Sequence, residues 1–271
     1  MARIVWVASY PKSGNTWLRF LLANLILCEQ VTSSTKVQLL VPDIHDGITG
    51  AHLMPGLTTL IKTHWAYNTA FPLREDTAGV IHLVRHPVDT LESNQNYAIN
   101  RSGELTLQKT PEEMQAFASN FVDEFIRDGG HRQFNQFGIG SMEQHFASWA
   151  SPVIVFPKLL VRYEALKEDP ERELKRISTF IKLKRTAEQI ALAVRNATDS
   201  EMRRLEETEI AEKRHGIFYQ DRNRSAIEAG HRFVGRSATG ASRYRLTPEQ
   251  RERATQRFAA LIRQMGYQAA P

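Results

Sequence analysis

The hydrophobic positions of this chain follow two alternating patterns along its length. Short, continuous apolar runs rich in β-branched residues indicate buried strands at 3–9, 59–62, 79–84 and 159–163. Apolar positions at helical spacing predict helices at about 15–28, 87–99, 111–127, 141–150, 170–182, 186–195 and 247–265.

Strands that alternate with helices are typical of a mainly parallel sheet covered on both faces. We therefore expect an α/β fold with a central, mainly parallel sheet flanked by helices. No repeat or linker divides the chain, so we expect a single domain over residues 1–271. Ligands of such sheets bind at the carboxyl ends of the strands. Lys12, His64 and Arg85 follow the first three expected strands, and these side chains should converge on one crevice.

Two stretches, 129–138 and 216–243, are rich in glycine and polar residues and show little periodicity. Long irregular segments of a compact domain serve either as plain surface loops or as lids over a site. The sequence leaves both interpretations open for each stretch.

The composition narrows the class of partner. Hydrophobic residues make up 42% of the chain and charged residues 24%, as in ordinary globular proteins, and the net charge is +5. The cations are interspersed with glutamates and form no stripe, which favours a local polyanion pocket over a nucleic-acid track. No stretch approaches the roughly 20 apolar residues of a membrane span. Cys28 is the single cysteine, so we expect a cytoplasmic protein without disulfides or a cysteine metal cluster.

The segment 10–17, Tyr-Pro-Lys-Ser-Gly-Asn-Thr-Trp, joins the first expected strand to the first expected helix. A strand, a tight loop and a helix N-terminus direct several backbone N–H groups at one spot, which suits an anion. Lys12 adds a full positive charge, and Ser13 and Thr16 add hydroxyl donors. In the nucleotide triphosphate loop G-x-x-x-x-G-K-S/T the lysine follows the last glycine, whereas here Lys12 precedes Gly14.

This segment resembles the 5′-phosphosulfate loop of the soluble sulfotransferases, which use 3′-phosphoadenosine 5′-phosphosulfate (PAPS). The resemblance implies a P-loop-like nucleotide-binding topology, PAPS as co-substrate and no metal. It also implies that the phosphosulfate is bound by Tyr10, Pro11, Lys12, Ser13, Gly14, Asn15, Thr16 and Trp17.

A second matching segment follows the third expected strand. Arg85, Pro87, Asp89 and Ser93 have the spacing of the family's 3′-phosphate segment, and the resemblance implies that Arg85 and Ser93 bind that phosphate. A guanidinium suits this role because its fork binds phosphate in bidentate fashion. Taken alone, the same residues are compatible with an Arg85–Asp89 surface pair.

The element Lys62-Thr63-His64 resembles the Lys-x-His element of the family. The resemblance implies that His64 is the catalytic base, with Lys62 and Lys12 assisting. Histidine suits this role because its ordinary pKa, about 6.5, lets it accept a hydroxyl proton near neutral pH. Trp65, Ala66 and Tyr67 follow His64 where the family usually has Leu-Pro.

Two later segments complete the resemblance. Tyr163 matches the tyrosine that lies against the adenine in the family, and Arg236 matches a cation of its C-terminal 3′-phosphate loop. The segment 243–252 resembles the family's dimer motif, with Pro248 in place of valine, and a homodimer is therefore one expectation.

The sequence thus predicts an enzyme that transfers the sulfuryl group of PAPS to a small-molecule hydroxyl or amine, such as that of a phenol, an alcohol or a natural product. Aromatic residues that could line an acceptor pocket are Trp65, Tyr67, Phe71, Phe134, Phe137 and Phe146. Two alternatives remain at this point. A kinase or nucleotide triphosphatase would need a metal-binding acid, for which Asp43 and Asp76 are candidates, and a non-catalytic anionic-nucleotide-binding module would not need His64.

Overall fold

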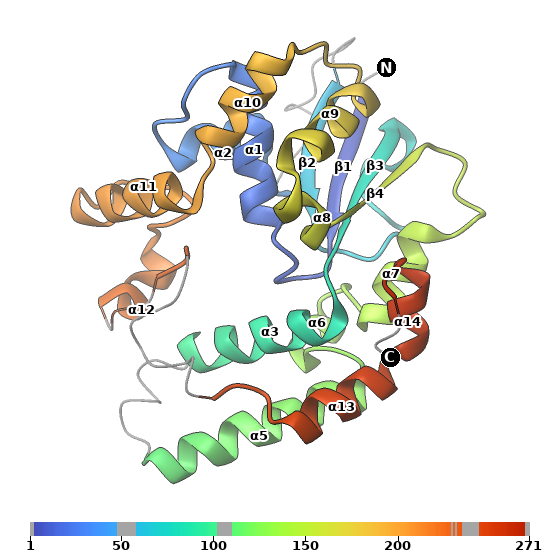
Figure 1. Cartoon of the computed structure of the whole chain (residues 1–271), viewed down its shortest axis with the longest axis vertical. Coiled ribbons are helices and arrows are strands. Elements are labelled where there is room, and N and C mark those ends of the chain that lie inside the picture. Colours follow the sequence, from blue (N-terminus) through green and yellow to red (C-terminus); the bar gives the residue numbers. More distant parts are fainter. Residues whose placement is uncertain are drawn as a thin grey trace.

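A four-stranded parallel sheet forms the centre of the molecule, in the order β2-β1-β3-β4 (Figure 1). The structure is a computed structural model, and it describes residues 3–47, 58–101, 110–228, 230, 232–234 and 244–268. The strands are β1 (Arg3–Ser9), β2 (Thr58–Thr63), β3 (Thr77–Val84) and β4 (Lys158–Arg162). The expected α/β fold with a mainly parallel sheet is confirmed.

The central strand β1 is apolar on both faces because helices cover both. Val5 and Val7 pack into one core cluster, beneath α1 (Asn15–Leu27), α9 (Pro170–Phe180) and α10 (Ala187–Arg195). Ile4, Trp6 and Ala8 pack on the opposite face, where α7 (Met142–Ala150) contributes Trp149. Consecutive residues of a strand point to opposite faces. A continuous apolar run is therefore what a strand buried on both faces requires.

A further group of helices lies beyond the carboxyl ends of the strands (Figure 1). It contains α3 (Pro87–Arg101), α5 (Pro111–Asp128), α13 (Pro248–Arg257) and α14 (Ala259–Gln264). Their apolar faces share one cluster, which includes Leu91, Phe125 and Phe258 together with Tyr10 at the end of β1. These helices therefore border the region at the carboxyl ends of the strands.

The remaining helices are shorter or lie at the periphery. They are α2 (Ser34–Leu40), α6 (Arg132–Gln136), α8 (Tyr163–Glu168), α11 (Asp199–Ala211) and α12 (Arg224–Glu228), with 3₁₀ turns at Ile44–Asp46 (η1), Arg74–Asp76 (η3) and Asp221–Asn223 (η4). None of the helices in the described part of the chain is long and apolar enough to cross a membrane.

The sequence located all four strands and missed specific helices. The helix expected at 247–265 is interrupted at Phe258, which lies between α13 and α14 and caps both. The pattern did not reveal α11, because this helix buries Glu206 and Glu209 beside Met202 and Leu205. Charged residues at buried positions hide the apolar stripe on which helix prediction depends. The irregular stretch 129–138 contains the short helix α6.

Candidate active site

The ends of three neighbouring strands are level with one another. Ala8 of β1 pairs with Thr63 of β2, and Ser9 pairs with Leu83 of β3. The residues that leave these strands therefore enter the same region, as expected for Lys12, His64 and Arg85. This region lies at the carboxyl edge of the sheet, where parallel α/β sheets bind their ligands.

The loop from β1 to α1 turns through two residues in the left-handed region. Lys12 has a φ of 72° and Gly14 a φ of 94°, and the Ser13 N–H donates a hydrogen bond to the Tyr10 carbonyl at 3.3 Å. The helix begins directly after Gly14, so its first N–H groups have no partner within the helix and point out of its N-terminus. The backbone therefore has the form of an anion-binding loop.

Glycine is required at position 14 by its neighbour as well as by its backbone angle. A Cβ placed there would lie 2.4 Å from Cδ2 of Tyr163, far inside van der Waals contact. Tyr163 begins α8, so the loop and the fourth strand's exit pack directly on each other. The ring of Tyr163 also meets that of Trp17 edge-on, with the ring centroids 5.8 Å apart.

Hydrogen bonds to β1, to α3 and to the segment before α6 hold the loop in place. Asn15 Nδ2 donates to the Val7 carbonyl at 3.2 Å and to Ser9 Oγ at 3.0 Å. Asn94 of α3 donates to the Pro11 carbonyl at 3.3 Å, and Tyr10 Oη accepts the N–H of His131 at 2.9 Å. The side chains of Tyr10 and Asn15 therefore act as braces of the loop. Pro11 and Ser13 are buried, Thr16 is half-buried, and Ser93 precedes Asn94 on α3.

Two cations meet beside the loop. Arg85 Nη1 donates to the Lys12 carbonyl at 3.3 Å, and its guanidinium carbon lies 4.8 Å from the centroid of the Tyr163 ring. Lys12 Nζ lies 4.7 Å from the centroid of Tyr97 and 5.6 Å from that of Phe233. Arg85 Nε is buried and has no hydrogen-bond partner among the described residues. Burial and the positive charge of Arg85 lower the pKa of Lys12 to about 8. Two adjacent cations, one of them with an unused N–H donor at Arg85 Nε, favour the binding of a polyanion beside the loop.

His64 lies at the base of the same loop. Its Nδ1 is 2.7 Å from the carbonyl oxygen of Ser9, the last residue of β1. A carbonyl oxygen can only accept, so Nδ1 carries the proton and Nε2 retains its lone pair. Burial, together with the Lys62 ammonium, holds the pKa of His64 well below its usual value. His64 is therefore a neutral imidazole whose basic nitrogen is Nε2.

Lys62 has a partner that the sequence analysis did not assign. Its Nζ lies 2.7 Å from Oδ2 of Asp43, and both side chains are largely buried. Burial lowers the pKa of Lys62 to about 8 against the opposing effect of Asp43. The sequence carries no signal for this pair, because Asp43 and Lys62 belong to segments whose approach is decided by how the chain folds.

Neither candidate metal-binding acid is placed for a kinase reaction. Asp43 forms the ion pair with Lys62, and Asp76 precedes β3, at the opposite end of the strand from Arg85. Within the described residues, no group of three or more metal-ligating side chains occurs. Arg236 lies outside the described residues, as does most of the segment expected to resemble the family's C-terminal loop.

Comparisons with known proteins identify the family of the chain. A family model described as the sulfotransferase domain matches residues 3–266. The chain belongs to this family. Sulfotransferase 1A1 of Rattus norvegicus is 26% identical over 185 residues, which cover 65% of this chain and 58% of that protein. The amine sulfotransferase of Oryctolagus cuniculus is 26% identical over 254 residues, covering 92% of this chain and 77% of that protein. The match thus spans less than two thirds of the rat protein.

The fold of this family member is that of solved sulfotransferases. Mouse sulfotransferase SULT7A1, whose structure was solved in complex with PAP, superimposes with a TM-score of 0.59 at 20% sequence identity. The superposition covers 96% of this chain and 84% of the mouse chain. At this identity the likeness concerns the fold, and the residues of the site must be judged on their own geometry.

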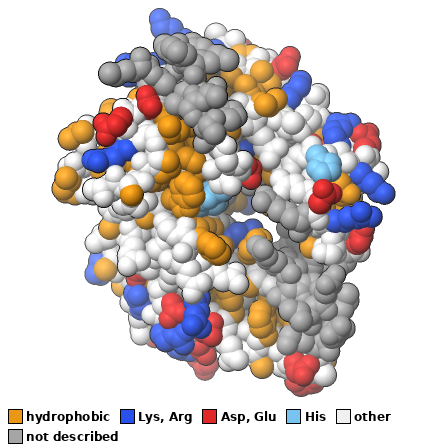
Figure 2. All heavy atoms as spheres, turned by 180° about the vertical axis from the view of Figure 1, so that it is seen from behind, with side chains coloured by type: hydrophobic (Ala, Val, Ile, Leu, Met, Phe, Trp, Pro, Cys, Tyr) orange, Lys and Arg blue, Asp and Glu red, His pale blue; other side chains and the backbone are white. Residues whose placement is uncertain are grey.

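The aromatic residues near His64 mostly pack against one another. Phe71 and Phe146 are buried in core clusters, and Tyr67 lies 5.0 Å from Phe71 between ring centroids. Trp65 packs edge-on against Phe71, whereas Phe137 is 67% exposed. Hydrophobic side chains gather beside a hollow on the rear face, with a histidine among them (Figure 2). The buried members are core residues, so they do not form an open pocket.

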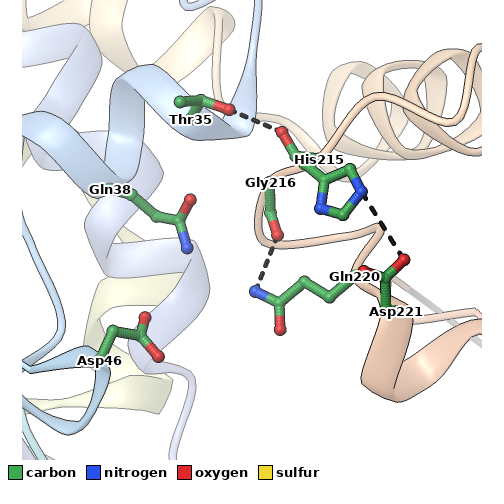
Figure 3. A pocket seen from close by; sticks show the side chains of 7 residues that line it. All are labelled: Thr35, Gln38, Asp46, His215, Gly216, Gln220 and Asp221. Atoms are coloured by element: carbon green, nitrogen blue, oxygen red, sulfur yellow. Dashed lines mark hydrogen bonds and ion pairs between the residues drawn. The ribbon is translucent and has the colours of Figure 1, made fainter.

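Two pockets border this region. One of about 320 Å³ is lined by Arg85, Asp89, Tyr163, Glu164, Lys167 and Glu168. Another of about 460 Å³ lies between the α2–η1 side and the segment 215–221, and Figure 3 shows its lining of Thr35, Gln38, Asp46, His215, Gly216, Gln220 and Asp221. The second pocket is lined mainly by residues with polar side chains and adjoins η1, whose His45 contacts His64.

His145 on α7 is a further buried histidine that the sequence analysis did not select. Its ring centroid lies 6.0 Å from that of Tyr10 and 5.7 Å from that of His82. Its Nε2 is buried without a hydrogen-bond partner among the described residues. It lies in mid-helix between Gln144 and Phe146, and the local sequence pattern does not single it out.

The contact between Gly14 and Tyr163 can be tested by the substitution Gly14→Ala. Gly47 is a matched control, because its φ is 88° and a Cβ there would meet nothing within 4 Å. We expect Gly47→Ala to cost about 1 to 2 kcal/mol from backbone strain alone. Gly14→Ala should cost about 2 to 5 kcal/mol, because Tyr163 must also move. Equal losses in urea unfolding of the two variants would contradict the contact.

Proposed function

We propose that this chain transfers the sulfuryl group of PAPS to a hydroxyl or amine of a small molecule. The observation that carries the proposal is the hydrogen bond from His64 Nδ1 to the Ser9 carbonyl, which fixes a basic nitrogen beside a cationic anion-binding loop. A binding module needs the loop and the cations but has no use for an oriented base. Family membership supports the same reaction.

In this proposal the protein supplies binding, orientation and charge. The loop's N–H groups, with Ser13 and Thr16, hold the phosphosulfate, and Arg85 with Ser93 holds the 3′-phosphate. Tyr163 and Trp17, whose rings meet beside the loop, are assigned to the adenine in this proposal. Arg236 is assigned to the 3′-phosphate by its match to the family motif alone.

The chemical step requires one proton transfer. His64 Nε2 removes the proton of the acceptor hydroxyl or amine as that atom attacks sulfur in line. The new bond joins sulfur to the acceptor, and the bond between sulfur and the bridging phosphate oxygen breaks. Lys12 stabilises the charge that develops on the leaving bisphosphate, because a fixed cation beside developing charge lowers the barrier. Lys62, paired with Asp43, supports the His64 segment.

The first test is calorimetric titration with adenosine 3′,5′-bisphosphate (PAP), with and without magnesium, and with ATP in parallel. We expect micromolar binding of PAP that does not depend on magnesium. Arg85→Ala should weaken it about 10- to 100-fold, since a hydrogen bond to a charged group contributes about 1.5 to 3 kcal/mol. Arg253→Ala is the control, because it also removes one positive charge but from an exposed pair with Asp123. Binding of ATP that requires magnesium, without binding of PAP, would support a kinase instead.

Transfer is tested with radiolabelled PAPS and 4-nitrophenol as the probe acceptor, followed by a panel of alcohols and amines. His64→Ala should lower kcat by about 100-fold or more and leave PAP affinity within about threefold, because His64 holds none of the nucleotide's charges. A wild-type protein that binds PAP but transfers sulfate to none of these acceptors would favour the binding module.

The lowered pKa of Lys12 predicts proton uptake on binding. At pH 8 about half of the free protein has Lys12 uncharged, since its pKa is about 8. A bound polyanion restores the charge, so binding of PAP at pH 8 should take up about half a proton, and affinity should fall as the pH rises further. Calorimetry in buffers of different ionisation enthalpy measures this uptake. Lys12→Arg remains charged and should abolish it; unchanged uptake in that variant would point to Lys62 instead.

A further inference from the structure

Two hydrogen bonds hold His64. The first joins its Nδ1 to the Ser9 carbonyl, and the second involves its backbone. Its backbone N–H donates to Nε2 of His45 at 3.0 Å. His45 belongs to η1, which follows α2 and lies along the outer edge of β2. A catalytic base placed directly after a strand needs such support, because the strand's own hydrogen bonds have ended.

The segment 42–45 continues the hydrogen bonding of β2 on the edge away from β1. The Lys62 N–H donates to the Pro42 carbonyl at 2.8 Å, and Asp43 forms a parallel bridge with Lys62. The next N–H on that edge is that of His64, two residues further on. Here the acceptor is the His45 imidazole, so a side-chain nitrogen takes the place of a backbone carbonyl.

Asp43 fixes both halves of this arrangement. Its Oδ1 accepts the backbone N–H of His45 at 3.1 Å, and its Oδ2 accepts Lys62 Nζ at 2.7 Å. The imidazole of His45 also meets the ring of Trp65 edge-on at 4.6 Å between centroids. Two contacts therefore join Asp43-x-His45 to Lys62-x-His64. The side chains of Asp43 and Lys62 form an ion pair, and the His45 side chain accepts the backbone N–H of His64.

We propose that His45 is a positioning residue for His64, in which the lone pair of its Nε2 holds the backbone of the base and thereby the direction of the base's own Nε2. The role in catalysis rests on the proposed function, whereas the hydrogen bond itself does not. An N–H can only donate, so Nε2 of His45 must be free of a proton. Removal from water and the Lys62 ammonium lower the pKa of His45 to about 4, which agrees with that requirement.

Two variants separate the hydrogen bond from ring packing. His45→Phe keeps a ring against Trp65 but offers no acceptor, and His45→Gln places an amide oxygen within reach of the same N–H. The first measurement is NMR of the protein labelled with ¹⁵N-histidine, without added nucleotide. We expect an unprotonated Nε2 at His45, and exchange of the His64 amide that is faster by about tenfold or more in His45→Phe but not in His45→Gln.

The second measurement is turnover with PAPS and 4-nitrophenol. His45→Phe should lower kcat on the order of tenfold with KM for PAPS unchanged, and His45→Gln should recover most of the loss. In a His64→Ala background, His45→Phe should have no further effect, because His45 acts only through His64. An additional loss in that background would indicate a merely structural role.

The two measurements keep the inference distinct from the proposed function. A protonated Nε2 at His45, or His64 exchange that is unchanged in His45→Phe, would overturn the positioning contact whatever the enzyme transfers. Failure of PAP to bind in calorimetry would instead overturn the proposed function and leave the NMR result valid.

Discussion

The parallel pairing of β1 with β2 on one edge and β3 on the other is the constraint on which the site depends. Because Ala8 is level with Thr63 and Ser9 with Leu83, the next residues of each chain segment emerge side by side. The hydrogen bond from His64 to the Ser9 carbonyl is possible only in this register. A shift of one residue would put Trp6 and Ala8 into the cluster that Val5 and Val7 now fill, so the packing of the two core clusters fixes the register, and the register fixes the site.

The site contains conformations and charges that are unfavourable in the unliganded protein. Lys12 adopts a left-handed backbone angle without being glycine, which costs on the order of 1 kcal/mol or more. Its ammonium also lies close enough to Arg85 for the two charges to lower its pKa. The hydrogen bonds from Asn15 and Asn94 offset part of this cost by fixing the loop's backbone. A polyanion would relieve the repulsion, so such a ligand is expected to stabilise the fold.

The edge of β2 shows how a short, irregular segment can support a catalytic group. Pro42, Asp43 and His45 satisfy successive donors of β2 without forming a strand of their own. These hydrogen bonds join segment 42–45 to segment 62–64, which are not adjacent in sequence. Asp43, considered from sequence as a metal-binding acid, is an ion-pair partner in the structure. An acid opposite a buried lysine neutralises it, and a metal ion would have to displace that lysine.

The sequence by itself determined the sheet, the glycine-containing turn between β1 and α1, and the family. Strands buried on both faces must be continuously apolar, so the run from Val5 to Ala8 predicts such a strand from sequence. A left-handed turn before a helix favours glycine, so Gly14 predicts the turn. Only the tertiary structure decided the partners. Charged groups on α11 are buried because backbone N–H groups of Phe233, Val234 and Ser34 meet Glu206 and Glu209 there. The pairing of Asp43 with Lys62, of His45 with His64, and of Tyr163 with Gly14 likewise joins distant segments. Local pattern records whether a residue can be buried, but the atoms it meets depend on how the whole chain packs.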